Sequence, residues 1–259
     1  MKDTYLWNPY TSVYKFLYGL GDLQSDDYVY GFGFGYKTIS QDYEIVRISC
    51  WKYDHHTQVE IYSVKRCSWR RIQDIPYRIF PLYNKAKLVN GVLHWVAKQY
   101  LTQNRVVLGY DINSEKLKEV PLPDCVDANF FVMTMDEYLG VTCLADTKFI
   151  VAWIMVDYGV RESWMKLYVI NTEDIPCSVN AFGLLPLCFM KNGAEILLSD
   201  LSCLYSYDTV SQDFKEFKID NLPDCAFDAT IYTESTVKLK TGYLKRKRTH
   251  NITGRRQGM

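Results

Sequence analysis

A strand–turn–strand unit that recurs along the chain constrains the fold of this sequence more than any other feature. In each unit an apolar strand ends in a short turn that contains Asp, Asn or Ser, and an aromatic or aliphatic residue opens the return strand. Such side chains can satisfy the backbone polar groups of a turn. The units start at Tyr5, Val59, Val107, Trp164 and Leu204. Their spacing is irregular but close to the ~40–50 residues of a β-propeller blade.

Further strands are expected between these hairpins, at Glu44–Ile48, Val92–Val96 and Glu195–Leu198. Two hairpin strands and one or two intervening strands make one small antiparallel sheet per repeat. No segment has a convincing helical period, and no linker rich in Pro, Gly or Ser divides residues 1–237. We therefore predict an all-β fold, a β-propeller with about five repeat units. Ala229–Ser235 is expected to be the final strand, beside Tyr5–Trp7.

One strand alternates strictly between aromatic residues and glycine, over Tyr30–Tyr36. The glycine face would let a neighbouring sheet approach closely, as the packed blades of a propeller require. A phosphate-binding loop is the alternative, but the glycines are spaced G-x-G-x-G, and Lys37–Ser40 does not open an amphipathic helix. The alternation therefore indicates sheet packing.

Charge is unevenly distributed, although 30 basic and 30 acidic residues balance over the whole chain. No acidic residue follows Glu234, whereas eight basic residues do, so residues 1–237 carry 22 basic and 30 acidic residues. We predict that residues 238–259 form a disordered basic tail. Within it, Lys245, Arg246, Lys247 and Arg248 resemble a nuclear-import or anion-binding patch. The acidic body should repel nucleic acid.

The N-terminal residues have no apolar signal-peptide core, and the longest apolar run, Phe149–Val156, is too short to span a bilayer. We expect a cytoplasmic or nuclear protein. The eight cysteines form no C-x-x-C pair, so a zinc site is not expected. Buried, reduced thiols are the prediction for them.

A series of short motifs runs along the chain: Leu6–Pro9, Tyr30–Tyr36, Asp42–Ile48, Val59–Ser63, Ser68–Arg70, Asn90–Trp95, Tyr110–Asp111, Glu119–Pro123, Trp153–Met155, Tyr158–Val160 and Glu162–Trp164. In this order the motifs resemble those of the plant F-box associated domain, type 1. The resemblance covers nearly all of residues 4–237. It implies a kelch-like propeller of the kind found in F-box/kelch-repeat proteins, including S-locus F-box-like proteins.

The resemblance also implies a function. Members of the family are usually substrate receptors of SCF-type ubiquitin ligases, which contain a Skp-family adaptor and a cullin. Their F-box precedes the propeller, whereas this sequence starts at what resembles the last strand of the first blade. Adaptor and cullin are therefore expected as partners only if an F-box is supplied upstream. The alternative is a protein-interaction module that is uncoupled from the ligase and competes for the same target.

The sequence contains little evidence for an enzyme active site. His94 lies in an apolar strand, where a structural histidine is expected rather than a ligand or base. Asp26–Asp27 is expected to be a solvated turn, and a copper-radical oxidase would need several converging His and Tyr ligands. No nucleophile elbow or H-E-x-x-H motif occurs. We predict no catalytic residue, no metal and no cofactor.

Recognition of an unidentified target protein needs only rigid loops that present aromatic and charged groups. The expected loops are Tyr18–Tyr28, Trp51–Gln58, Gln99–Arg105 and Asp124–Phe130. The candidate partner-binding residues on them are Trp51, Tyr53, His55, His56 and Tyr100. Partial burial in the packing is the alternative for the aromatic residues. For the two histidines the alternatives are an exposed loop, a pH-sensitive contact or a metal contact.

Overall fold

A computed structural model of the 259-residue chain describes most of the predicted propeller. The described residues are 5–17, 28–51, 57–80, 85–124, 130–146, 148–175, 184–190, 193–200, 203–217, 229–232 and 234–236. The chain divides into two compact units, of which one contains Met1–Leu23 and Thr233–Met259 and the other Gln24–Tyr232.

The smaller unit contains an antiparallel hairpin of β1 (Tyr5–Asn8) and β2 (Val13–Phe16). The Asn8 amide oxygen accepts from the backbone N–H groups of Tyr10 and Thr11, which closes the turn. The Asn8 nitrogen donates to the carbonyl of Ser235 at 2.8 Å. The described residues of 229–236 form no strand, so the prediction of a final strand at Ala229–Ser235 is wrong.

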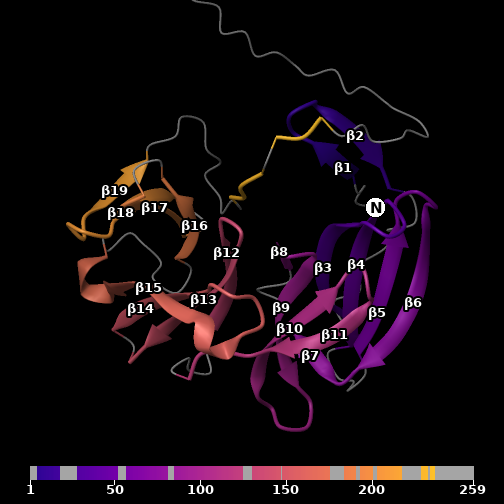
Figure 1. The fold of residues 1–259 in the computed structure, drawn as a ribbon, viewed down its shortest axis with the longest axis horizontal. Coiled ribbons are helices and arrows are strands. Elements are labelled where there is room, and N and C mark those ends of the chain that lie inside the picture. The colour runs from indigo at the N-terminus through magenta and orange to yellow at the C-terminus, as the bar shows by residue number, and fades with distance from the viewer. Residues whose placement is uncertain are drawn as a thin grey trace, which may run out of the picture. The chain divides into compact units, whose positions relative to one another are not determined.

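The larger unit contains four antiparallel sheets, which follow one another in chain order (Figure 1). The first sheet contains β3 (Tyr28–Lys37), β4 (Asp42–Trp51), β5 (Thr57–Ser63) and β6 (Ser68–Ile75). The second contains β7 (Tyr77–Ile79), β8 (Lys87–Val89), β9 (Val92–Gln99), β10 (Arg105–Asp111) and β11 (Lys116–Val120). The third contains β12 (Phe130–Met135), β13 (Tyr138–Ala145), β14 (Phe149–Met155) and β15 (Trp164–Asn171). The fourth contains β16 (Leu185–Phe189), β17 (Glu195–Ser199), β18 (Leu204–Asp208) and β19 (Phe214–Phe217). These sheets confirm the all-β, propeller-type class.

The first strand of the second sheet is split into two pieces. β7 and β8 both pair with β9, β7 near its end and β8 near its start. Between them, Lys85 forms a parallel bridge with Phe32 of β3, and the Ala86 N–H donates to the Phe32 carbonyl at 2.7 Å. The split strand therefore joins the first sheet to the second through the backbone.

Three apolar clusters hold the four sheets together, one between each pair of successive sheets. Strand β9 of the second sheet contributes side chains to two of these clusters. Leu93, Trp95 and Ala97 pack toward the first sheet, and Val96 packs toward the third. Both faces of β9 are therefore buried, which explains its nearly continuous apolar sequence.

The glycines of β3 allow the first two sheets to approach, as predicted. A Cβ on Gly33 would lie 2.6 Å from Leu93 Cδ1 and 2.9 Å from Trp95 Cζ2. Phe34 and Tyr36 of β3 lie on the opposite face, where their side chains are exposed. Phe34 stacks on Tyr43 of β4 with ring centroids 5.3 Å apart.

A cluster of charged residues also joins the first two sheets. Glu115 accepts hydrogen bonds from Lys37 and from Arg70, whose Nη1 is 2.9 Å away. Both cations also lie 3.8 Å from Glu44. The bond from Arg70 is the main reason that the pKa of Glu115 is lowered, whereas burial raises the pKa of Glu44. These contacts attach the β10–β11 turn to the first sheet.

Two predictions about the strands and thiols need correction. Trp164–Asn171 is the last strand of the third sheet, β15, and not the opening strand of a hairpin. Its partner β14 precedes it, and the 3-10 helix η2 (Arg161–Ser163) lies in the turn between them. The five described cysteines are free thiols, but Cys67 is exposed, because it lies in the β5–β6 turn, where its φ is 53°.

Helical structure is nearly absent from the part of the chain that the structure describes. It consists there of η2 and a second 3-10 helix, η3 (Thr172–Asp174). No described helix is long and apolar enough to cross a membrane.

Candidate functional site

The antiparallel order gives the sheets of the larger unit two different ends. At one end, called here the loop end, lie the end of β4, the start of β5, residues 100–104 and the end of β11. At the other, the turn end, lie residues 38–41, 64–67, 90–91, 112–115, 136–137, 156–163 and 209–213. The strands β4, β9 and β11, which precede three of the loops expected to bind a partner, all end at the loop end.

Two of the predicted partner-binding residues can be placed there. Trp51 ends β4, and Tyr100 follows β9. The hydroxyl of Tyr100 is 2.9 Å from that of Thr57, the first residue of β5, and its N–H donates to the carbonyl of Pro76. Tyr100 is half-buried, so it holds the loop in place as well as lining the surface.

The structure thus brings Tyr100 to the base of the segment that carries the other candidates. Tyr53, His55 and His56 of that segment lie outside the described residues, as do Lys245, Arg246, Lys247 and Arg248. Their assignment to partner binding or nuclear import stays a prediction.

Leu101, next to Tyr100, is a functional candidate that the sequence analysis did not single out. Its side chain is 92% exposed, although leucine is among the residues most often buried. The loop that presents it is held by its own hydrogen bonds. Gln99 N–H donates to Asn104 O at 3.0 Å, and Gln103 N–H donates to Gln99 O at 3.1 Å. Leu101 is therefore an exposed apolar group on a hydrogen-bonded loop, next to Tyr100.

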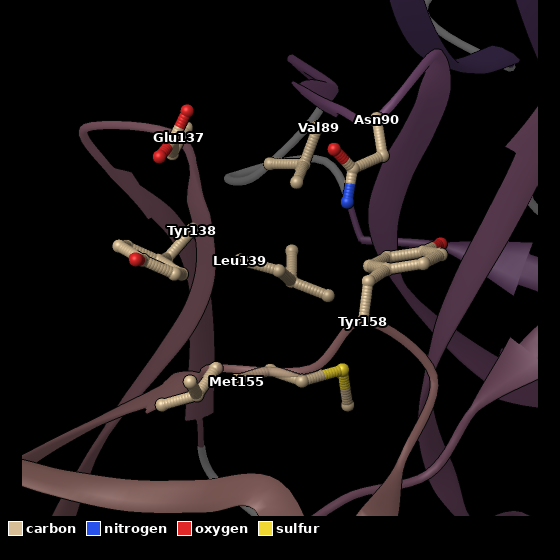
Figure 2. A pocket seen from close by; sticks show the side chains of 8 residues that line it. Val89, Asn90, Glu137, Tyr138, Leu139, Met155 and Tyr158 are labelled. Carbon is tan, nitrogen blue, oxygen red and sulfur yellow. The ribbon is translucent and has the colours of Figure 1, made fainter.

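At the turn end, a pocket opens between the second and third sheets (Figure 2). Its volume is about 270 Å³. Three turns or strand ends meet there, and the lining residues are Val89, Asn90, Glu137, Tyr138, Leu139, Met155, Val156 and Tyr158. Val89, Leu139 and Met155 are buried and make an apolar floor. Met155 is fixed by the Gly159 N–H, which lies 2.9 Å from its Sδ.

His94 fixes Tyr158, which forms one wall of this pocket. His94 is completely buried, with Nδ1 3.0 Å from the carbonyl of Lys87 and Nε2 2.7 Å from the Tyr158 hydroxyl. Burial lowers the pKa of His94 to about 4, so the ring is neutral. Because a carbonyl only accepts, Nδ1 carries the proton, and the Tyr158 hydroxyl must donate to Nε2. The predicted structural role of His94 is confirmed.

The mouth of the pocket is polar. Asn90 and Gly91 both have positive φ, 51° and 74°, as in the two-residue type I′ turn that joins β8 to β9. This turn presents the Asn90 side chain, and the β12–β13 turn presents the exposed carboxylate of Glu137. Among the described residues, no three His, Cys, Asp or Glu side chains are placed to hold a metal ion. The surface that the pocket offers is therefore mainly polar, because the apolar residues beneath it are buried.

Comparisons with known proteins assign the whole region to one kind of domain. The profile of a family described as F-box associated beta propeller domain matches residues 1–239. F-box protein CPR1 of Arabidopsis thaliana is 26% identical over 233 residues, which cover 80% of this chain and 55% of that protein. F-box/kelch-repeat protein At3g23880 of the same plant is 27% identical over 244 residues, 91% of this chain and 64% of that protein.

The chain thus spans less than two thirds of the length of these relatives. Among solved structures, TolB from Acinetobacter baumannii aligns with 83% of this chain and 51% of its own, at 13% identity and a TM-score of 0.42.

Proposed function

Because the chain belongs to the family of F-box associated β-propeller domains, we propose that it binds the protein to be modified by an SCF-type ubiquitin ligase. The family match over residues 1–239 carries this proposal. The relatives that match are F-box proteins, and such proteins would supply the link to a Skp-family adaptor and a cullin. We assign the domain itself no catalytic residue.

The loop end of the larger unit is the surface that we propose for the target. Four sheets with packed cores provide a rigid support for its loops. Leu101 is the anchor with the clearest geometry, because its loop is already ordered. Burying a leucine side chain contributes about 1.5–3 kcal/mol, and little of this is spent on ordering the loop. We propose Tyr100 and the candidates on residues 51–56 as further contacts with the target.

The test is affinity capture from plant extract with the 259-residue chain and two variants, Leu101→Asp and Val210→Asp. Val210 is a matched control, since it is 83% exposed but lies in the β18–β19 turn, at the turn end. We expect a target that the wild type and Val210→Asp retain and that Leu101→Asp loses at least about tenfold. Equal capture by all three proteins would refute the loop end as the binding surface.

The ligase link is tested separately, by probing the captured material for adaptor and cullin. A target without adaptor favours the ligase-uncoupled module for this polypeptide. The chain is then joined behind the F-box of a relative such as F-box protein CPR1 and mixed with the remaining ligase components. Ubiquitin transfer to the target that Leu101→Asp abolishes is the expected result. A target that binds but is never modified would contradict the ligase assignment.

A further inference from the structure

We propose that three basic residues at the loop end of the second sheet, Arg78, Lys98 and Arg105, bind a phosphorylated residue of the target protein. These three residues are called here the cation row. This inference rests on the proposed function, because it names the chemical state in which the target is recognised. The phosphate contacts the cation row, and an apolar residue of the same target contacts Leu101.

The cation row results from the pairing of three neighbouring strands, β7, β9 and β10 (Figure 1). Lys98 of β9 lies directly opposite Arg78 of β7 on one side and Arg105 of β10 on the other. Directly paired residues of antiparallel strands project from the same face of a sheet. Adjacent strands are about 4.8 Å apart, so the backbones of the outer two are about 10 Å apart. Residues 100–104, which carry Leu101, connect β9 to β10 and therefore border the row.

The fold itself gains no stability from bringing these charges together. Like charges directly opposite each other on paired strands destabilise a sheet. The first sheet contains the favourable arrangement, because Arg47 of β4 is directly opposite Glu60 of β5 and forms a salt bridge with it at 2.7 Å. Among the described residues, no carboxylate forms a salt bridge with any member of the cation row. Glu119 of β11 accepts hydrogen bonds from Tyr77 and Gln99, which alternate with the row residues and so lie on the other face.

One contact brings the charges of the cation row closer together. The Arg105 guanidinium lies over the ring of Phe80, 4.1 Å from its centroid. Phe80 follows β7, and its N–H donates to the Val96 carbonyl of β9 at 3.4 Å, so it lies on the same face as Arg78, two residues earlier. The side chain of Arg105 therefore reaches across β9 toward Arg78. The contact with the ring also restricts the guanidinium before a ligand binds, which lowers the entropic cost of binding.

The number of charges selects a phosphate over a carboxylate. A carboxylate has one charge and two oxygens, which a single guanidinium group satisfies in a bidentate pair. A phosphorylated side chain carries about −1.5 to −2 charges at pH 7 and three strong acceptor oxygens. Two guanidinium groups and one ammonium group match this charge and provide donors for each oxygen. A glutamate in the same position should therefore bind more weakly than a phosphorylated residue.

The charge of the surrounding protein favours a single phosphate over a long polyanion. Residues 1–237 carry 22 basic and 30 acidic residues, so the cation row is a local positive patch on a negatively charged body. A nucleic acid would extend beyond the row and meet this negative charge. One phosphorylated residue on an otherwise neutral segment meets only the row.

The test measures binding of dye-labelled peptide pools to the full chain by fluorescence anisotropy, at about pH 7.5, where the phosphate is mainly a dianion. The pools have phosphoserine, glutamate or serine at a fixed central position and random neutral residues, including leucine, around it. The proteins are the wild type, Arg78→Gln, Lys98→Gln and Arg66→Gln. Arg66 is the matched control, because it is an exposed arginine of the β5–β6 turn, at the turn end. The basic residues of 238–259 are the same in all four proteins, so anions that bind there do not distinguish them.

We expect the wild type to bind the phosphoserine pool at least about tenfold more tightly than the glutamate or serine pool. Arg78→Gln and Lys98→Gln should each weaken binding of the phosphoserine pool about tenfold, whereas Arg66→Gln should leave it unchanged. The inference is overturned if the glutamate or serine pool binds as tightly as the phosphoserine pool. It is also overturned if the row variants retain wild-type affinity, or if no pool binds.

Thermal melting distinguishes loss of a binding group from loss of structure. Lys98→Gln removes the charge that lies between two arginines, so this variant should melt no lower than the wild type. A lower Tm would show that the row stabilises the fold, contrary to this inference.

Affinity capture separates this inference from the proposed function. Treatment of the extract with a phosphatase should prevent capture of the target by the wild type. A target that is still captured after this treatment, and still lost with Leu101→Asp, would leave the proposed function intact and overturn this inference. Phosphoserine binding by the cation row without any captured target would refute the proposed function and support the row as a phosphate site.

Discussion

Gly35 offers a sharp test of how the first and second sheets pack, because alanine there meets a single obstacle. A Cβ on Gly35 would lie 2.1 Å from Ile112 Cδ1, whereas the next atoms, Ile112 Cγ1 and Leu88 Cδ1, are 3.6 Å away. Ile112 is completely buried, so its terminal methyl group has no open space to move into. Gly35→Ala therefore forces one methyl group against another inside a closed core.

The cost follows from two opposing terms. Overpacking by one methyl group costs about 1–3 kcal/mol. Alanine in a strand regains about 0.5–1 kcal/mol relative to glycine, because it loses less conformational freedom on folding. We expect Gly35→Ala to lower the free energy of unfolding by about 1–2 kcal/mol, which for a chain of this size lowers Tm by about 2–8 °C.

A second substitution identifies the obstacle. Ile112→Val deletes the Cδ1 methyl group and alone costs about 0.5–1.5 kcal/mol. In the double variant the methyl group added at position 35 fills the space that the shorter side chain at position 112 vacates. The double variant should therefore be no less stable than Ile112→Val. The two changes should then couple favourably by about 1–2 kcal/mol.

Urea unfolding of the four proteins, followed by tryptophan fluorescence, measures this coupling. Gly33→Ala combined with Ile112→Val is the control, because a Cβ on Gly33 meets Leu93, Trp95 and Ala86 but not Ile112. Its effects should add within about 0.5 kcal/mol. Additive effects for Gly35→Ala and Ile112→Val, or a stabilising Gly35→Ala, would refute the packing that the structure shows.

Other perturbations test other parts of the chain. Burial lowers the pKa of His94 from 6.5 to about 4, so the folded state binds fewer protons than the unfolded state in this pH range. The free energy of unfolding should therefore fall by about 3 kcal/mol between about pH 6.5 and 4. Urea unfolding of His94→Gln should show a weaker dependence on pH. Leu101→Asp should change the free energy of unfolding by no more than about 0.5 kcal/mol, so unchanged melting with lost binding separates recognition from folding. The pKa of Glu115 is lowered, chiefly through its bond from Arg70. Glu115→Gln should therefore destabilise the protein at neutral pH. The difference in the free energy of unfolding between this variant and the wild type should shrink as the pH falls below about 4.5. Asn8→Ala removes the acceptor for Tyr10 and Thr11 and the donor to Ser235; hydrogen exchange at Tyr10 and Thr11 should accelerate, and unchanged rates would show that the amide does not close the turn.

Local patterns made much of the fold predictable. The alternation over Tyr30–Tyr36 reports which face of one strand can approach a neighbour, and this information is contained in the strand itself. Hairpins with short turns, such as Val59–Ser63 with its return strand, are equally local. In the third sheet, Trp164–Asn171 was wrongly predicted to open a hairpin. The reason is that β14 and β15 are both apolar and aromatic, and the long turn between them, 156–163, has no strong hairpin sequence.

The candidate site was less predictable, because it depends on contacts between distant segments. The pocket combines Asn90, Glu137 and Met155 from two sheets, and nothing in the sequence indicates that these turns meet. The loop carrying Tyr100 was predicted, but a single leucine in a polar turn has no periodicity, so Leu101 was missed. The sequence feature that could have indicated Leu101 is an apolar residue among turn residues, next to a tyrosine.

The packing of each sheet against the next one in the sequence has a consequence for synthesis on the ribosome. The N-terminal part of a chain emerges first, at about 5–20 residues per second. The core between the first and second sheets uses no described residue beyond Leu117, so it can close while the third sheet is still being translated. Until then, the second-sheet face with Val96 and Val107 is open. A nascent chain that stalls after Val120 would expose that face, and we expect chaperones to bind there.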